Sequence, residues 1–205
     1  MVEPSPVVHV VDDDASFLAA VSRLLRAAGF TVRRYGSAAE FLAQREPGTP
    51  GCVLADLRMP GMSGLDLQSA LANAPDPLPV VFLSAHGDVP TTVRAMKQGA
   101  EDFLVKHAPR QQLLDAVHRA LERDRHERET RARREELRTR LAALTPREHE
   151  VFRQVVQGKL NKEIAAELGI HERTVKLHRT ALTTKLGVQS VAQLTRLAQE
   201  AGVLP

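Results

Sequence analysis

The stretch Val7-Val8-His9-Val10-Val11-Asp12-Asp13-Asp14 joins a short, mostly β-branched run to three consecutive carboxylates. The apolar run predicts a strand that is buried on both faces of a sheet. Carboxylates placed side by side repel one another by roughly 1 kcal/mol or more at a partly screened site, so burial of the strand gives no reason for them. We therefore expect a positively charged partner at the end of this strand.

The same alternation of apolar runs and helical patterns continues to about residue 118. We expect strands over 7–11, 31–35, 52–55, 80–84 and 103–105, and helices over 15–28, 38–44, 64–74, 89–98 and 109–120. Because crossovers between parallel strands are right-handed, this order predicts an α/β domain, a (βα)5 doubly wound parallel sheet. Sites in such sheets form at the carboxyl ends of the strands.

Composition and charge divide the chain into two halves. With 205 residues, 43% of them hydrophobic, the chain is long enough for two modest domains. Residues 1–118 carry 10 basic and 13 acidic side chains, whereas residues 119–205 carry 18 and 12, which makes the C-terminal half the candidate for binding a polyanion. No apolar run approaches the roughly 20 residues of a membrane span, and the N-terminus lacks a signal-peptide layout. We expect a cytoplasmic protein with no membrane partner.

The C-terminal half predicts a helical linker and a small all-α domain. Residues 121–140 alternate Glu and Arg at helical spacing without Gly or Pro, so we expect an exposed linker helix. Such a helix has either no specific role, or it sets the geometry of two domains or pairs with a second copy. Thr145, Pro146 and Glu148 form a dense helix-start signal. Further helices are expected over 161–168, 172–186 and 191–201, and the tight turn at Gly169 predicts a helix-turn-helix.

Polar residues follow four of the expected strands. Asp12 and Asp13 follow the first strand and Asp56 follows the third, so these carboxylates should converge on one pocket, where Mg²⁺ would offset their repulsion. Ser84 ends the fourth strand and Lys106 follows the fifth. A hydroxyl, an ammonium and a cation around one carboxylate are the parts of an aspartyl-phosphate site with Asp56 as nucleophile.

These motifs resemble those of two-component response regulators of the FixJ-like subgroup. VVDDD, ADLRMPGMSG, LSAHGD and DFLVK resemble a flavodoxin-like receiver domain (6–120), which the linker (121–140) joins to a LuxR-type helix-turn-helix DNA-binding domain (141–205) marked by LTPREHEVF, NKEIAAELGI and TVKLHRTALTTKLGV. The resemblance implies phosphoryl transfer from a sensor histidine kinase to Asp56, dimerisation on phosphorylation, and sequence-specific binding of promoter DNA to regulate transcription. It implies RNA polymerase as a further partner. It also implies a protein that is no enzyme, except that it catalyses its own phosphorylation and dephosphorylation with Mg²⁺.

The same resemblance assigns roles to individual residues. Mg²⁺ ligands are Asp13 and Asp56 directly, Asp12 through water, and the backbone carbonyl of Arg58. Ser84 and Lys106 assist the transfer, and Ser84 is coupled to the switch residue Phe103. The alternative interpretation of Phe103 is an ordinary buried aromatic residue of the strand. The dimerising face implied by the resemblance includes Val93, Lys97 and Phe103.

One position departs from the receiver pattern. Receivers normally carry a cis Pro after the site lysine, whereas this chain has His107. Because a non-proline cis bond costs about 3 to 4 kcal/mol, we expect a trans or visibly strained Lys106-His107 bond. We hypothesise that this loop slows phosphorylation or loosens its coupling to output.

The helix expected over 172–186 is the candidate recognition helix. Four of its side chains are expected to face away from the core positions Val175 and Leu182 and to enter the major groove, namely Lys176, Leu177, Arg179 and Thr180. Expected phosphate contacts are Asn161, Lys162, Thr174 and Lys185. The alternative for the individual basic residues is solvated surface.

Two other function classes stay open. A Mg²⁺-dependent phosphohydrolase with Asp56 as nucleophile would need a second acid two residues on, where Arg58 stands, and it leaves the helix-turn-helix unexplained. A DNA-binding protein whose receiver is only a constitutive dimerisation scaffold would agree with the departure at His107. Acetyl phosphate or beryllofluoride, added with Mg²⁺, separates these hypotheses.

Overall fold

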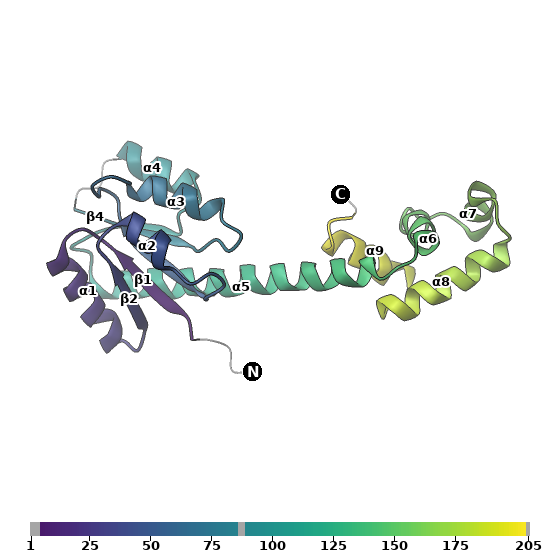
Figure 1. The fold of residues 1–205 in the computed structure, drawn as a ribbon, viewed down its shortest axis with the longest axis horizontal. Helices are drawn as coiled ribbons and strands as arrows, with labels where there is room; N and C mark the ends of the chain where they lie inside the picture. Colours follow the sequence, from purple (N-terminus) through teal and green to yellow (C-terminus); the bar gives the residue numbers. More distant parts are fainter. Residues whose placement is uncertain (1–4, 86–88, 204–205) are drawn as a thin grey trace. The chain divides into compact units, whose positions relative to one another are not determined.

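The computed structural model describes residues 5–85 and 89–203 (Figure 1). The chain divides into two compact units, with the boundary between Glu127 and Arg128. Helix α5 (Arg110–Ala142) runs across that boundary. None of the helices in the described residues combines the length and the apolar character needed to cross a membrane.

The N-terminal unit is built on a parallel sheet. Its strands, in the spatial order β2-β1-β3-β4-β5, are β1 (Val7–Val11), β2 (Thr31–Tyr35), β3 (Gly51–Asp56), β4 (Val80–Ser84) and β5 (Asp102–Val105). All residues of β1, β3 and β4 are buried, as continuous apolar runs predict. Val11 pairs with Ala55, so Asp12 and Asp56 follow side by side at the carboxyl edge. The doubly wound, flavodoxin-like fold is confirmed.

Helices cover both faces of this sheet (Figure 1). On one face α1 (Ala15–Ala27) packs with α5, and on the other lie α2 (Ala38–Gln44), α3 (Gly64–Ala72) and α4 (Val89–Lys97). Asp14 is the N-cap of α1, because its carboxylate accepts hydrogen bonds from the backbone N–H groups of Ser16 and Phe17. The third carboxylate of the opening run therefore caps a helix.

His9 is a buried titratable residue in β1. It is 2% exposed, its Nδ1 lies 3.2 Å from the hydroxyl oxygen of Tyr35, and its ring packs edge-on against Phe41. Burial, together with the nearby Arg33 and Arg45, lowers the pKa of His9 to about 4. The imidazole is therefore neutral in the folded protein near pH 7.

Acid should weaken the N-terminal unit through His9. The unfolded chain binds a proton on His9 near pH 6.5, and the folded chain binds it only near pH 4. The free energy of unfolding is therefore highest above pH 6.5, and it falls as the pH drops toward 4. The loss in the free energy of unfolding is about 3 kcal/mol. Urea unfolding followed by the fluorescence of Tyr35, the single tyrosine in a chain without tryptophan, measures it. His9→Val should flatten this pH dependence, and an equally steep loss in both proteins would contradict the assignment.

The C-terminal unit is all-helical. It contains α6 (Pro146–Val156), α7 (Asn161–Leu168), α8 (Glu172–Leu186) and α9 (Val191–Glu200), packed around a core that includes the fully buried Ile164, Val175 and Leu182. The helix start expected at Thr145 is a complete capping box with Glu148. Gly169 and Gly187 end α7 and α8 in the left-handed conformation, with φ of 64° and 65°. The short turn between α7 and α8 confirms the helix-turn-helix.

Helix α5 is mostly exposed over 121–140, as the sequence predicts, but two of its side chains in that segment are buried. Asp124 in that segment is 1% exposed, and its carboxylate accepts a hydrogen bond of 2.8 Å from the backbone N–H of Gly51 at the start of β3. Leu137 is fully buried in the C-terminal core together with Leu141. The charged helix thus belongs to both units at its two ends, because each end supplies buried side chains to the adjoining core.

Candidate functional site

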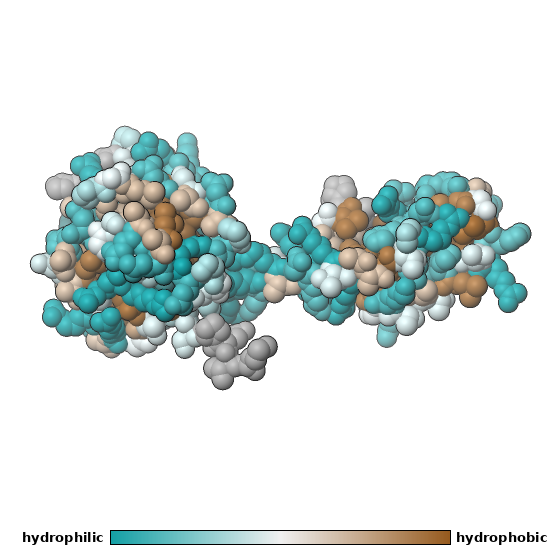
Figure 2. All heavy atoms as spheres, viewed as in Figure 1, coloured by the Kyte–Doolittle hydropathy of each residue, from teal (hydrophilic) through white to brown (hydrophobic). Residues whose placement is uncertain are grey.

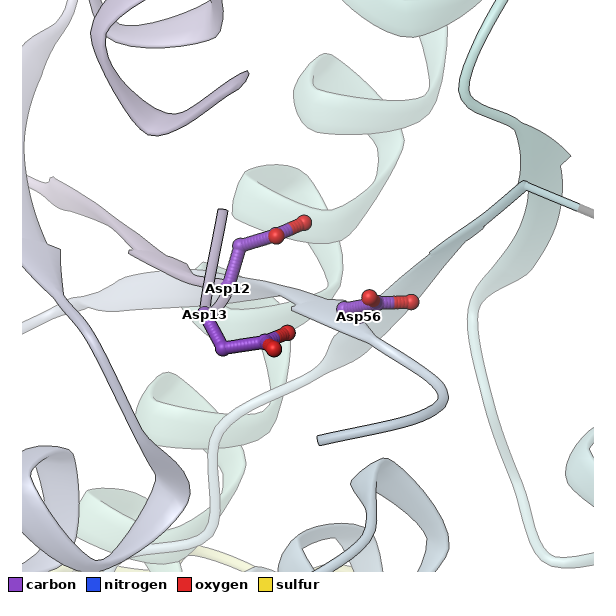
Figure 3. Close-up of side chains that lie close together, drawn as sticks. All are labelled: Asp12, Asp13 and Asp56. Carbon is purple, nitrogen blue, oxygen red and sulfur yellow. The ribbon is translucent and has the colours of Figure 1, made fainter. Parts of the chain in front are cut away.

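Three carboxylates gather at the carboxyl edge of the sheet, as the sequence predicts. Asp12 and Asp13 follow β1 and Asp56 ends β3, and one ligand oxygen from each lies within 4.8 Å of the others (Figure 3). This edge is the point at which the strand order reverses between β1 and β3, where open α/β sheets bind ligands. The fold therefore brings three like charges to one candidate site.

The carboxylate cluster fits a hard divalent cation. Carboxylate oxygens are the ligands that Mg²⁺ prefers, and Mg²⁺ retains several waters when it binds. Asp13 is exposed, so a hydrated cation can reach the cluster, while Asp12 and Asp56 form its buried side. Burial raises the pKa of Asp12, and the ion pair with Lys106 and the hydrogen bond from the Asp14 backbone offset part of that rise. The backbone N of Arg58, the remaining predicted ligand residue, lies 3.4 Å from Asp56 Oδ1.

Lys106 is the positively charged partner of the cluster. Its Nζ lies 2.7 Å from Asp12 Oδ2 and 3.1 Å from Asp56 Oδ2, and its side chain is 18% exposed. Partial burial alone would lower the pKa of Lys106, but its interactions with the carboxylates of Asp12 and Asp56 raise it above its ordinary value. The ammonium therefore stays charged and bridges two carboxylates from different strands.

The Lys106-His107 peptide bond is trans, as expected from the absence of proline, since the described residues contain no cis bond. The backbone N–H of Ala108 donates to the carbonyl of Val105 at 2.8 Å, which closes a tight turn around Lys106 and His107. The N–H of Lys106 in turn donates to the carbonyl of Ser84 at 2.8 Å. The turn thus holds the lysine at the site without a proline.

Ser84 and Phe103 lie on the same face of the sheet. Phe82 pairs with Phe103 and Ser84 pairs with Val105, and alternate residues of a strand share a face. Ser84 is 3% exposed, whereas Phe103 is half-buried and packs near Phe82, with ring centroids 6.2 Å apart. The switch predicted for this pair is therefore possible in geometry. His86, Gly87 and Asp88 of the LSAHGD motif lie outside the described residues.

A further residue at the site, Phe17, was not expected from the sequence. Its ring in the first turn of α1 lies under the ammonium of Lys106, with Nζ 4.4 Å from the ring centroid. The only sequence signal was its position three residues after the carboxylate run, where α1 begins beside the site. Contact with β5 depends on packing across the sheet, which no local pattern reports.

The recognition helix α8 presents part of the expected face. Lys176, Leu177 and Thr180 are exposed, with Leu177 at 65%, and apolar residues lie among hydrophilic ones on the visible face of this unit (Figure 2). The expectation that Arg179 faces away from the core is wrong. Four residues after Val175 returns to nearly the same side of a helix, and Arg179 Nη1 donates to Asn161 Oδ1 at 2.8 Å. Arg173 and Thr184, which were not expected, are exposed on the outer side.

Two of the residues predicted to contact phosphate, Asn161 and Lys185, pair with side chains of the same unit. Asn161 accepts from Arg179, and Lys185 Nζ lies 2.7 Å from Glu148 Oε2. Lys162 is exposed at the start of α7, and Thr174 is half-buried in the first turn of α8.

The hydrogen bonds from Lys185 and from the Thr145 backbone lower the pKa of Glu148 to about 2.

Comparisons with known proteins agree with both units. The family described as response regulator receiver domain matches residues 8–118, and the one described as bacterial regulatory proteins, luxR family, matches residues 142–198. Nodulation protein W of Bradyrhizobium diazoefficiens is 43% identical over 96% of this chain and 87% of that protein. Transcriptional regulatory protein FixJ of Azorhizobium caulinodans is 40% identical over 100% and 97%.

Solved structures show the same likeness. Response regulator StyR superposes with a TM-score of 0.82 at 45% identity, covering 96% of this chain and 99% of that one. Full-length FixJ from B. japonicum gives a TM-score of 0.59 at 35% identity, covering 98% and 100%. Both the fold of the chain and its order of domains therefore have known counterparts.

Proposed function

The chain belongs to the two-component response regulators, with a receiver domain and a LuxR-type DNA-binding domain that regulate transcription, and we propose that phosphorylation of Asp56 controls its DNA binding. The observation that supports this most is Lys106, whose ammonium bridges Asp12 and Asp56 at 2.7 and 3.1 Å. The proposed domain bounds are 6–120 and 141–205, joined by 121–140, and the two family matches lie within them.

The proposed reaction transfers a phosphoryl group from a phosphohistidine of a sensor kinase. An Asp56 carboxylate oxygen attacks phosphorus, the bond from phosphorus to the imidazole nitrogen breaks, and the kinase histidine leaves with the electron pair. Lys106 and the Ser84 hydroxyl would neutralise and bind the phosphoryl oxygens. Mg²⁺, held by Asp13, Asp56, the carbonyl of Arg58 and Asp12 through water, would supply further charge neutralisation. The chain would thus catalyse only its own phosphorylation and dephosphorylation.

The proposed output begins at the same edge of the sheet. A phosphoryl group adds nearly two negative charges, and movement of Ser84 toward it would vacate space for Phe103. The neighbouring helix α4 buries Ala95 alone among its residues, all of which are described, and exposes Val93 and Met96 at 45% and 43%. Because α4 has a single buried residue, a small shift of this helix can change how its exposed apolar side fits a partner. This suits a face that dimerises on phosphorylation.

The proposed readers of DNA lie on the outer side of α8. Lys176 can reach guanine acceptors and Leu177 a thymine methyl in the major groove. Thr180, Lys162 and Thr174 would add base or backbone contacts. The proposed partners are a sensor histidine kinase, a second copy, promoter DNA and RNA polymerase, and the proposed location of the chain is the cytoplasm. The hypothesis that His107 slows phosphorylation or loosens its coupling to output stays a prediction.

Beryllofluoride with Mg²⁺ tests this function directly. Because it mimics a phosphoryl group on a carboxylate, we expect the full chain to shift from monomer to dimer, measured by light scattering. Steady turnover of acetyl phosphate by a chain that stays monomeric would instead favour the phosphohydrolase. A chain that is dimeric throughout, and indifferent to beryllofluoride, would favour the constitutive scaffold.

Replacing Glu148 by Ala should destabilise the C-terminal unit by about 2 kcal/mol, because the capping box of α6 and the partner of Lys185 are lost together. Thermal unfolding of the full chain, followed by circular dichroism at a helix wavelength, measures the effect on the C-terminal transition. Glu150→Ala is the matched control, since Glu150 is an exposed residue of the same helix and forms a surface ion pair with Arg147. Equal stability of the two variants would refute a structural role for Glu148.

A further inference from the structure

The ammonium of Lys106 has an aromatic neighbour as well as two carboxylates. Its Nζ lies 4.4 Å from the centroid of the Phe17 ring, 2.7 Å from Asp12 Oδ2 and 3.1 Å from Asp56 Oδ2. The distance to the ring is well within the roughly 6 Å over which a cation is attracted to an aromatic face. One side of the ammonium therefore contacts an uncharged ring, which leaves the ion pairs with the two carboxylates intact.

The ring itself is held in place from two directions. Phe17 lies in the first turn of α1, where its backbone N–H donates to the Asp14 carboxylate at 3.1 Å. Its half-buried side chain packs against the core between the sheet and helices α1 and α5. By contrast, Lys106 follows the short strand β5, whose residues are all half-buried, and it stands in a turn that lacks proline. A fixed ring therefore lies beside a long and more flexible side chain.

We propose that Phe17 is a positioning residue that holds the Lys106 ammonium against Asp12 and Asp56 through its aromatic face. This inference rests on the proposed phosphorylation of Asp56. Without the ring, Lys106 gains freedom to turn toward water, so a smaller fraction of molecules has the ammonium placed for an incoming phosphoryl group. The aromatic face supplies orientation and takes no part in bond making.

Phosphorylation by acetyl phosphate at saturating Mg²⁺ tests the proposal in the full chain. Phe17→Leu, which keeps an apolar side chain but removes the ring, should lower the rate of phosphorylation about fivefold, equivalent to about 1 kcal/mol. Phe17→Tyr should restore the rate to within about twofold, because it keeps the aromatic face. Phe30→Leu is the matched control, since Phe30 packs against the same core and contacts His118 instead of Lys106.

The Lys106→Met background shows whether the ring acts through the lysine. In that background Phe17→Leu should produce no further loss of rate. A loss of the same size with and without Lys106 would overturn the proposal, as would a Phe17→Leu protein that is phosphorylated as fast as wild type. A wild-type chain that takes up no phosphoryl group would instead contradict the proposed function, so the two failures are distinguishable.

A second measurement needs neither Mg²⁺ nor a phosphodonor. The side-chain methylene signal of Lys106 next to Nζ, assigned by its loss in Lys106→Met, should be shifted upfield by the ring in wild type and in Phe17→Tyr. In Phe17→Leu it should move to the position of the exposed lysines. A signal that does not respond to Phe17→Leu would show that the ring does not face the ammonium in solution.

Discussion

Replacing Asp56 by Asn should abolish phosphorylation of the chain. The amide is nearly the same size as the carboxylate but cannot act as the nucleophile, so no acyl phosphate forms. The fold should persist, because Lys106 retains its ion pair of 2.7 Å with Asp12 and one of three crowded negative charges is removed. The measurement is the incorporation of labelled phosphate from acetyl phosphate or a phosphorylated kinase, with thermal unfolding as a check on the fold.

Asp14→Asn is the matched control for this experiment. Asp14 belongs to the same carboxylate run, but its side chain caps α1, and Asn is an equally good N-cap. We expect this variant to take up label like wild type. Labelled phosphate on Asp56→Asn would place the phosphorylation elsewhere and remove the basis of the proposed switch.

Replacing Lys176 and Leu177 together by Ala should weaken specific DNA binding about 100-fold. A base contact in the major groove contributes about 1 to 3 kcal/mol, and these two exposed residues are the proposed readers. The stability of the C-terminal unit should change by less than about 0.5 kcal/mol, because neither side chain is buried. Anisotropy of a labelled fragment from the chain's own upstream region measures the affinity.

Arg196→Ala separates base reading from loss of charge. Arg196 is a strongly exposed residue of α9, with a side chain that is 82% accessible and pairs with Glu200. Its removal lowers the positive charge as much as removal of Lys176, so we expect a loss of only a few-fold. If both variants weaken binding equally, α8 does not read the bases through Lys176 and Leu177.

Local sequence patterns predicted most of the fold. Apolar runs marked the strands, and the capping signal at Thr145 marked a helix start, because both signals act within a few residues. The convergence of Asp12, Asp13 and Asp56 was predictable from topology alone, since parallel strands end at one edge. The carboxylate cluster could thus be predicted without knowledge of any tertiary contact.

Contacts between distant segments were not predictable in the same way. Glu148 and Lys185 lie 37 residues apart, and Gly51 and Asp124 lie 73 apart, so their pairing depends on how whole elements pack. The contact of Phe17 with Lys106 is of the same kind. The position of Arg179, by contrast, was predictable from the sequence. It lies four residues after Val175, and this spacing places it on the inner side of α8.

The affinity of the full chain for DNA from its own upstream region, measured in Mg²⁺ with and without beryllofluoride, tests the central claim most directly. We predict that beryllofluoride tightens binding by wild type about tenfold, within the usual range of allosteric coupling, and leaves Asp56→Asn unchanged. Equal affinities of wild type in both conditions, or equal tightening of the Asp56→Asn variant, would contradict the account.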